Sequence, residues 1–493
     1  MKIFALAAVA SWVAACAPQP AAAPDVPAPV PAPPVPAPVT ATSTKTARPP
    51  ALIVSTREKP FAPVALSAEV ARSATPDVSV DLSKPQQAME GFGGAFNEHG
   101  WSALLALEPA ERDAVMRAIF DPKEGLRFNL ARTPVGASDY STDRYTLNEA
   151  RGDFAMSKFS IERDKKLLIP YIQAALKVRP DLKVWASAWT PPTWMKTNGA
   201  FDSGAMKDDP KVYGAYALYL AKFVESYRAE GIPIYMVVPQ NEPAQLTRYP
   251  SCDWKPAQYV TFIRDHLAPT FEQRNLDTQI YVGTINRDDW DVFSVLADPG
   301  VAAVISGAAF QWGGLKYVAD VKKQHPKLSI MQSETECGNN HWQPGFDPER
   351  PQNDFKYAAH TWRKFRDFIA AGASSYFLWN IVLDEHGKNI DSQRPWPQNS
   401  AVVVDRTTKK VIYTPMYFAT RHFSGLVDRG ARLLETSGAN PNRIAFQNPD
   451  GSVVVELMND TPAATRVTVA VGADTHVVEL PAESFASLVI PAG

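Results

Sequence analysis

Eight short β-type runs, separated by stretches of helical pattern, constrain the fold of this chain more than any other feature. The runs cover residues 90–96, 127–135, 183–189, 234–239, 279–283, 304–310, 329–333 and 375–379. Several of the helical stretches open with a proline, as at Pro109, Pro210 and Pro256, which suits the first turn of a helix. This alternation predicts parallel strands with crossover helices, and eight such strands close a (β/α)8 TIM barrel.

The pattern changes after residue 427. Short strand-like runs follow one another from residue 432 to residue 490, separated by turn residues such as Pro449, Asp450 and Gly451. They predict a small all-β module, joined by an N-terminal strand near residues 78–82. The predicted fold class is therefore α/β, with a TIM barrel over residues 88–427. A β-sandwich side domain, made of residues 61–87 and 428–493, is appended to it.

The N-terminus has the pattern of an export signal. After Lys2, an apolar run over residues 3–13 is too short to span a bilayer, and small residues lead from it directly to Cys16. This resembles a bacterial lipobox, so we expect residues 1–16 to be a lipoprotein signal peptide with a lipidated Cys16. An ordinary secretory signal is the alternative. Residues 17–60, rich in Pro and Ala, are expected to form an extended linker. We expect an exported protein, lipid-anchored at the periplasmic or outer-membrane face of the cell envelope, or otherwise secreted.

The charge balance excludes one class of function. Lys and Arg number 50 and Asp and Glu number 52, so the net charge is -2. A nucleic-acid-binding protein normally carries a basic excess, and we therefore expect no nucleic-acid partner. If Cys16 is lipidated, Cys252 and Cys337 remain, too far apart in sequence for metal-ligand spacing. Whether these two form a disulfide or stay as free thiols is open.

Two glutamates stand where predicted barrel strands end. Glu242 follows the fourth strand and Glu334 the seventh, and residues at the carboxyl ends of barrel strands face the active site. Cleavage of a glycosidic bond needs one carboxylic acid to protonate the leaving oxygen and one carboxylate to meet the cationic anomeric carbon. Glu336 is an alternative to Glu334, because residues two apart on a strand share a face. We favour Glu334, which lies nearer the strand end.

Aromatic and polar residues occupy the same predicted rim. Trp189, Trp312 and Trp379 offer flat apolar faces to sugar rings. Asn241 and Arg132 can hydrogen-bond sugar hydroxyls and carboxylates. Together with the two glutamates they predict a carbohydrate-binding active site.

Several motifs, taken in order, resemble those of glycoside hydrolase family 30. They are EGFGGA at 90–95, ARTP at 131–134, SDYS at 138–141, WTPPTWMKTNG at 189–199, QNEP at 240–243, SE at 333–334 and WN at 379–380. The resemblance covers nearly the whole chain after the linker. It implies a barrel with a side β-module and neither a metal nor an organic cofactor.

The resemblance also implies a role for each site residue. Glu242 matches the acid/base and Glu334 the nucleophile. Asn241 matches the residue that holds the sugar 2-hydroxyl, and Arg132 matches the arginine that keeps the nucleophile ionised. The residues that match the lining of the pocket for the non-reducing sugar are Asp139, Trp189 and Trp379.

The chain also departs from the family pattern. Glucosylceramidases of the family carry His-Trp-Tyr after strand six, whereas residues 311–314 here read QWGG. The resemblance as a whole still predicts a retaining β-glycoside hydrolase that acts on β-glucosides such as β-1,6-glucan or glucosylceramide-like substrates. The alternatives are a β-xylosidase of the same family and a non-catalytic carbohydrate-binding surface lipoprotein. The expected partner is a carbohydrate or glycolipid substrate. We expect the protein to associate with a membrane only through its N-terminal lipid anchor.

Overall fold

The computed structural model describes residues 49–67, 75–287, 290–340, 346–348 and 354–492. The predicted signal peptide, the predicted lipidation site Cys16 and most of the predicted linker lie outside these ranges. The remainder of the chain contains the predicted barrel and the predicted β-module. Of the helices in the described ranges, none is both long and apolar enough to cross a membrane.

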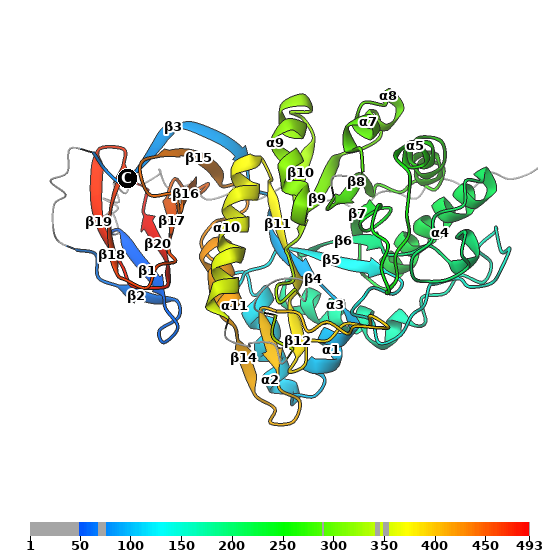
Figure 1. Cartoon of the computed structure of the whole chain (residues 1–493), viewed down its shortest axis with the longest axis horizontal. Coiled ribbons are helices and arrows are strands. Elements are labelled where there is room, and N and C mark those ends of the chain that lie inside the picture. Colours follow the sequence, from blue (N-terminus) through cyan, green and yellow to red (C-terminus); the bar gives the residue numbers. More distant parts are fainter. Residues whose placement is uncertain (1–48, 68–74, 288–289, 341–345, 349–353, 493) are drawn as a thin grey trace, which may run out of the picture. The chain divides into compact units, whose positions relative to one another are not determined.

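Eight parallel strands close into a barrel, which confirms the predicted fold class (Figure 1). They are β4 (Gly91–Ala95), β5 (Leu130–Val135), β6 (Lys183–Ala188), β7 (Ile234–Val238), β8 (Gln279–Ile285), β9 (Gly307–Gln311), β10 (Ser329–Glu334) and β11 (Ser375–Asn380). Large side chains such as Trp185, Met236 and Phe377 fill the barrel interior. The barrel therefore has a packed core, and its chemistry is confined to the end where the strands stop.

Helices flank the barrel strands, and they begin at the predicted Pro109, Pro210 and Pro256 among other residues. They are α1 (Glu98–Leu104), α2 (Pro109–Phe120), α3 (Leu168–Val178), α4 (Pro210–Ala229), α5 (Pro256–Thr261), a π-helix (Phe262–Leu267), α6 (Ala268–Gln273), α7 (Val292–Leu296), α8 (Pro299–Ala302), α9 (Leu315–Gln324), α10 (Phe355–Ala371) and α11 (Pro415–Ser424). In α10 the buried Phe355, Ala358, Trp362, Phe365 and Ile369 recur at helical spacing and pack into the main core. The helix stops at Gly372, whose φ of 123° suits glycine.

Nine strands build the β-module as one continuous hydrogen-bonded sheet. In sheet order they are β19 (Asp474–Leu480), β18 (Thr465–Val471), β3 (Val78–Ala88), β15 (Arg432–Ser437), β16 (Arg443–Gln447), β17 (Val453–Asn459), β20 (Ser484–Ile490), β1 (Ala51–Ser55) and β2 (Ala62–Val64). Buried residues of strands that lie far apart in this sheet order share one apolar core. Examples are Val54 of β1, Val455 of β17, Val469 of β18 and Val478 of β19. The sheet thus closes over itself as the predicted sandwich.

One predicted boundary is wrong. The linker was expected to run to residue 60, but Ala51–Ser55 forms β1 and pairs antiparallel with β20. Leu52 and Val54 are buried, because alternate residues of this strand face the module core. Strand β1 therefore belongs to the β-module and not to the linker, as does β2, which lies in the predicted 61–87 part of the side domain.

A second sheet, of three short strands, was not predicted. It consists of β12 (Val382–Asp384), β13 (Val402–Val404) and β14 (Val411–Tyr413). It begins just after β11, and a long loop over residues 385–401 runs between its first two strands. This loop reaches the active site, as described below.

Candidate active site

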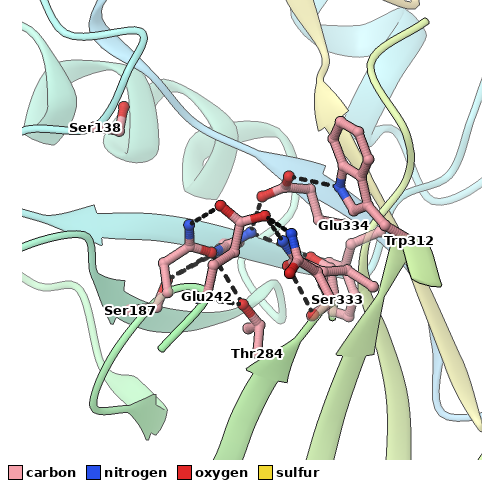
Figure 2. A network of polar contacts seen from close by, with 12 residues as sticks. Ser138, Ser187, Glu242, Thr284, Trp312, Ser333 and Glu334 are labelled. Atoms are coloured by element: carbon pink, nitrogen blue, oxygen red, sulfur yellow. Dashed lines mark hydrogen bonds and ion pairs between the residues drawn. The ribbon is translucent and has the colours of Figure 1, made fainter. Parts of the chain in front are cut away.

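The predicted site residues meet at the carboxyl end of the barrel. Glu334 is the last residue of β10, Arg132 lies on β5, and Asn241 and Glu242 follow β7. Figure 2 shows the Glu242 and Glu334 side chains within one network of polar contacts. Both are almost fully buried, with exposed fractions of 8% and 5%. The barrel thus brings together residues that lie about a hundred positions apart in the sequence.

Glu334 has a cationic partner. Its Oε2 accepts a hydrogen bond from Nη1 of Arg132 at 2.6 Å, and its Oε1 accepts one from the indole Nε1 of Trp312 at 3.1 Å. Burial raises the pKa of Glu334, while the charge of Arg132 and the hydrogen bond from Trp312 oppose that rise. Both of its oxygens therefore have donors that favour the carboxylate form.

Arg132 links this carboxylate to the next residue of the network. Its Nη2 donates to Oδ1 of Asn241 at 2.6 Å and to Oγ of Ser187 at 2.9 Å. The guanidinium also lies over the rings of Trp189, 4.5 Å from the centroid, and Trp185, at 4.9 Å. These contacts fix a fully buried cation in one orientation.

Glu242 has only uncharged donors. Its Oε1 accepts hydrogen bonds from Nδ2 of Asn286 and, at 2.8 Å, from Nε2 of Gln311. Its Oε2 has one weaker contact, with Nδ2 of Asn241 at 3.3 Å. The backbone of Glu242 has a φ of 50°, and its N–H donates to Oγ1 of Thr284 at 3.2 Å. A left-handed backbone at a non-glycine residue is a strained feature that commonly occurs at functional sites.

The two carboxyl groups are therefore unequal. Burial, followed by the negative charges of Glu334 and Asp139, raises the pKa of Glu242 to about 8. Glu334 has the arginine partner and Glu242 does not, so the single negative charge of the pair belongs on Glu334. At neutral pH this arrangement favours a protonated Glu242 beside a Glu334 carboxylate that is held by Arg132.

Aromatic side chains form one wall of the site. Trp189 and Trp379 stack with their ring centroids 5.1 Å apart, and Tyr140 contacts Trp379 edge-on. Trp396, from the loop between β12 and β13, packs against Trp312 at 6.5 Å. The hydroxyl of Tyr140 donates to the carbonyl oxygen of Gly387 at 2.7 Å, which holds the same loop in place. Flat apolar faces at this position suit the C–H face of a sugar ring.

Asp139 is the third buried carboxyl group at the site. It is 5% exposed, and the side chain of Trp379 donates a hydrogen bond to it. Burial, with the charge of Glu334, raises the pKa of Asp139 to about 8. A neutral Asp139 can both donate and accept a hydrogen bond, which suits contact with a sugar hydroxyl.

Glu336 lies in different surroundings from Glu334. Because β10 ends at Glu334, the alternation of the strand does not extend to Glu336. Its carboxylate pairs with His360 Nε2 and Lys364 Nζ of α10, each at 3.0 Å. Although burial raises its pKa, the hydrogen bond from His360 and the charges of His360 and Lys364 lower it to about 2. Its contacts are with α10, outside the hydrogen-bond network of Glu242 and Glu334.

Sequence reasoning gave no role to three polar residues that contact the carboxyl pair or its neighbours. Asn286 and Gln311 donate to Glu242, and Ser187 accepts from Arg132. The rule that strand ends face the site points to Gln311, which ends β9, and could equally have found Asn286, which directly follows β8. The cysteines left open by the sequence, Cys252 and Cys337, are both buried free thiols. Within the described ranges, no group of three or more His, Cys, Asp or Glu side chains is placed to hold a metal ion.

Comparison with known proteins agrees with this geometry. The chain matches the family model described as "Glycosyl hydrolase family 30 TIM-barrel domain" over residues 89–427 and the "Glycosyl hydrolase family 30 beta sandwich domain" over residues 430–488. It is 28% identical over 419 residues to the lysosomal acid glucosylceramidase of Mus musculus, covering 80% of this chain and 79% of that protein. It is 25% identical over 410 residues to an endo-1,6-β-D-glucanase of Neurospora crassa, covering 78% and 81%. The crystal structure of SrfJ from Salmonella typhimurium superimposes with a TM-score of 0.81 at 23% identity, covering 90% of this chain and all of that one.

Proposed function

Since the chain belongs to glycosyl hydrolase family 30, we propose that it cleaves β-glucosidic bonds by double displacement, with retention of anomeric configuration. Membership of this family and its curated relatives make it a β-glycoside hydrolase. The observation that supports the mechanism is the inequality of the two buried glutamates. Glu334 is paired with Arg132, while Glu242 has neutral donors alone.

In the first half-reaction, Glu334 attacks the anomeric carbon and forms a covalent glycosyl ester. The bond to the leaving oxygen breaks as Glu242 transfers its proton to that oxygen. Arg132 keeps Glu334 ionised before attack, and its second nitrogen holds the Asn241 amide oxygen. The amide nitrogen of Asn241 then lies on the side of Glu242, 3.3 Å from its Oε2, and its second N–H can donate to a substrate hydroxyl beside the anomeric carbon.

In the second half-reaction, Glu242 acts as a base. Once Glu334 is esterified its negative charge is gone, so the repulsion that raises the pKa of Glu242 is relieved. Glu242 then deprotonates a water molecule, which attacks the anomeric carbon and releases Glu334. The sugar leaves with its original configuration.

The proposed donor sugar is glucose. The curated relatives are named as glucosylceramidases and endo-1,6-β-glucanases. Both names indicate cleavage next to a glucosyl group, and they differ in the group that is attached to it. A β-1,6-glucan and a glucosylceramide-like glycolipid are therefore the two substrates to compare, with a β-xyloside as the alternative sugar. A binding protein without turnover is not favoured, because both carboxyl groups are present and are connected through Arg132 and Asn241.

The test is sugar release by the chain from residue 49 onward. The panel is an aryl β-glucoside, an aryl β-xyloside, β-1,6-glucan and glucosylceramide. We expect glucose or gluco-oligosaccharides to be released, and NMR of the first-formed product should show the β-anomer. Release of the α-anomer would contradict double displacement, and no turnover of any of the four would contradict the proposed function.

We also propose that the protein is exported and held at the cell envelope through Cys16. The support is the apolar run that ends in small residues before this cysteine. The test is fractionation of cells that express the full chain or its Cys16→Ser variant. We expect the full chain in the membrane fraction and the variant in the soluble fraction; equal distributions would contradict the anchor.

A further inference from the structure

Two consecutive residues donate to the two different glutamates of the site. Gln311 donates through Nε2 to Oε1 of Glu242 at 2.8 Å. Its neighbour Trp312 donates through Nε1 to Oε1 of Glu334 at 3.1 Å. Figure 2 shows Trp312 beside Glu334 in the network that also contains Glu242. Two consecutive residues therefore contact both the proposed acid, Glu242, and the proposed nucleophile, Glu334.

This double contact needs an irregular backbone. In a regular strand, consecutive side chains point to opposite faces, and only one of the two could face the site. Here β9 ends at Gln311, and Trp312 has a φ of 49°, in the left-handed region. The chain turns at this point, so both side chains reach the mouth of the barrel. A left-handed tryptophan is costly and persists only where its surroundings fix it.

The two glycines that follow make the turn possible. A Cβ at Gly313 would come within 2.7 Å of the carbonyl oxygen of Asn286, and one at Gly314 within 2.2 Å of that of Ile285. Only glycine allows the turn to approach the end of β8 so closely. The same approach brings Asn286, the second donor to Oε1 of Glu242, next to the turn.

The amide of Gln311 is oriented by a further contact. Oγ of Ser333 lies 3.3 Å from Oε1 of Gln311 and can donate to it. The amide nitrogen of Gln311 is thereby directed at Glu242. Oε1 of Glu242 has two amide donors, whereas Oε2 has only the weaker contact with Asn241 at 3.3 Å, so Oε2 is the oxygen better placed to carry the proton.

We propose that Gln311 and Trp312 are positioning residues that divide the roles of the two glutamates, Gln311 fixing the proton of Glu242 on Oε2 and Trp312 holding Glu334 as the attacking carboxylate. Neither side chain titrates, so neither exchanges a proton with the pair. This inference rests on the proposed function, because it assigns acid and nucleophile to the same two residues.

The two contacts have separable effects on the pH profile. The acidic limb of kcat/KM reports ionisation of the nucleophile and the basic limb reports loss of the acid's proton. The charged or titratable groups around Glu242 are Glu334, Asp139, Arg132, Tyr249 and Cys337. A hydrogen bond donated to a carboxylate lowers its pKa, so loss of either donor raises the pKa of its own glutamate.

The experiment compares Gln311→Met and Trp312→Phe, which remove the donors and keep similar side-chain size. Gln311→Met should move the basic limb upward by about one pH unit, and Trp312→Phe should move the acidic limb upward by about as much. Gln311→Met should lower kcat/KM about 10- to 100-fold for an alkyl β-glucoside, which needs protonation, and far less for a dinitrophenyl β-glucoside. Trp312→Phe should lower kcat/KM by similar factors for both substrates, because Glu334 attacks in both.

A milder variant protects the test against misfolding. Ser333→Ala removes only the hydroxyl that contacts Oε1 of Gln311 and the carbonyl oxygen of Phe310. It should move the basic limb in the same direction as Gln311→Met by a smaller amount. Unchanged limbs in folded, active variants would overturn the inference, as would equal loss with both leaving groups for Gln311→Met. Inactivity of the unmodified chain on every substrate would instead count against the proposed function.

Discussion

Arg132 donates one hydrogen bond to Glu334 and a second, also of 2.6 Å, to Asn241, the residue that precedes Glu242. A single buried guanidinium therefore connects the end of β10 to the end of β7. Arginine suits this position because its planar fork donates in two fixed directions and remains charged when buried. The negative charge of the pair is in this way assigned to one glutamate by a cation that the other glutamate does not contact.

The first prediction separates two glutamates that are only two positions apart. Glu334→Gln should lower kcat by more than about 10⁴-fold, because the amide cannot form the glycosyl ester. Glu336→Gln is the matched control and should retain activity, since Glu336 pairs with His360 and Lys364 of α10. Initial rates on an aryl β-glucoside measure both. Loss of activity in the control together with a functional Glu334→Gln would reverse the assignment.

The second prediction concerns the acid. Glu242 has a pKa raised to about 8, so kcat/KM should fall as the pH rises through about 8 and the proton is lost. Glu242→Gln should abolish this limb and lower kcat/KM about 10²- to 10⁴-fold on a β-glucoside with a poor leaving group. An activated aryl glucoside should still give a burst of released aryl group, because departure of this leaving group needs no proton. A pH profile that keeps the basic limb in Glu242→Gln would assign the acid to another group.

The third prediction follows from the lowered pKa of Glu336. In the folded protein this pKa is about 2, against a usual value of 4.5. The resulting stability is present above pH 4.5 and is lost as the pH falls toward 2. Urea unfolding at pH 7 should show Glu336→Gln to be less stable by at most about 3 kcal/mol. The difference in the free energy of unfolding between the two proteins should become smaller as the pH falls below 4.5. A difference that grows there would contradict the ion pairs of Glu336.

The barrel could be read from the sequence because parallel strands buried on both faces appear as separate apolar runs. Strand ends then located Glu242, Glu334 and Arg132 without any knowledge of distances. The same reasoning could not show which way a side chain points once the strand has ended. Trp312, with its left-handed backbone, is predicted to contact the sugar, and its indole N–H donates to Glu334, a contact that the sequence pattern does not reveal.

The N-terminal boundary failed for a different reason. Residues 51–55 read ALIVS and follow a long Pro-rich tract, so composition assigned them to the linker. They pair on one side with the short strand β2 and on the other with β20, more than 400 residues away, and pairing over such a separation leaves no local pattern. Only the buried alternation of Leu52 and Val54 marks them as a strand.

That boundary leads to the last prediction, which compares chains that start at residue 49 and at residue 61. The shorter chain lacks β1, so β20 loses its antiparallel partner over residues Ala51–Ser55. It also loses the hydroxyl of Ser55, which lies 2.8 Å from Nε2 of the fully buried His422 on α11. Removing Leu52 and Val54 forfeits about 1.5–3 kcal/mol each, and an unpartnered buried nitrogen costs about 1–3 kcal/mol more.

We therefore expect the residue-61 chain to aggregate or to unfold at a markedly lower temperature, because an apolar strand edge is left open. The residue-49 chain should unfold at the same temperature as the full chain. Ser55→Ala in the residue-49 chain removes the contact with His422 and the hydrogen bond that Ser55 Oγ accepts from the N–H of Phe61. It should reduce stability by about 1–3 kcal/mol without opening the sheet edge. Calorimetry and size-exclusion chromatography measure these outcomes. Equal melting temperatures for the two truncations would mean that β1 contributes nothing to the module, and the linker would then extend to residue 60 as the composition indicated.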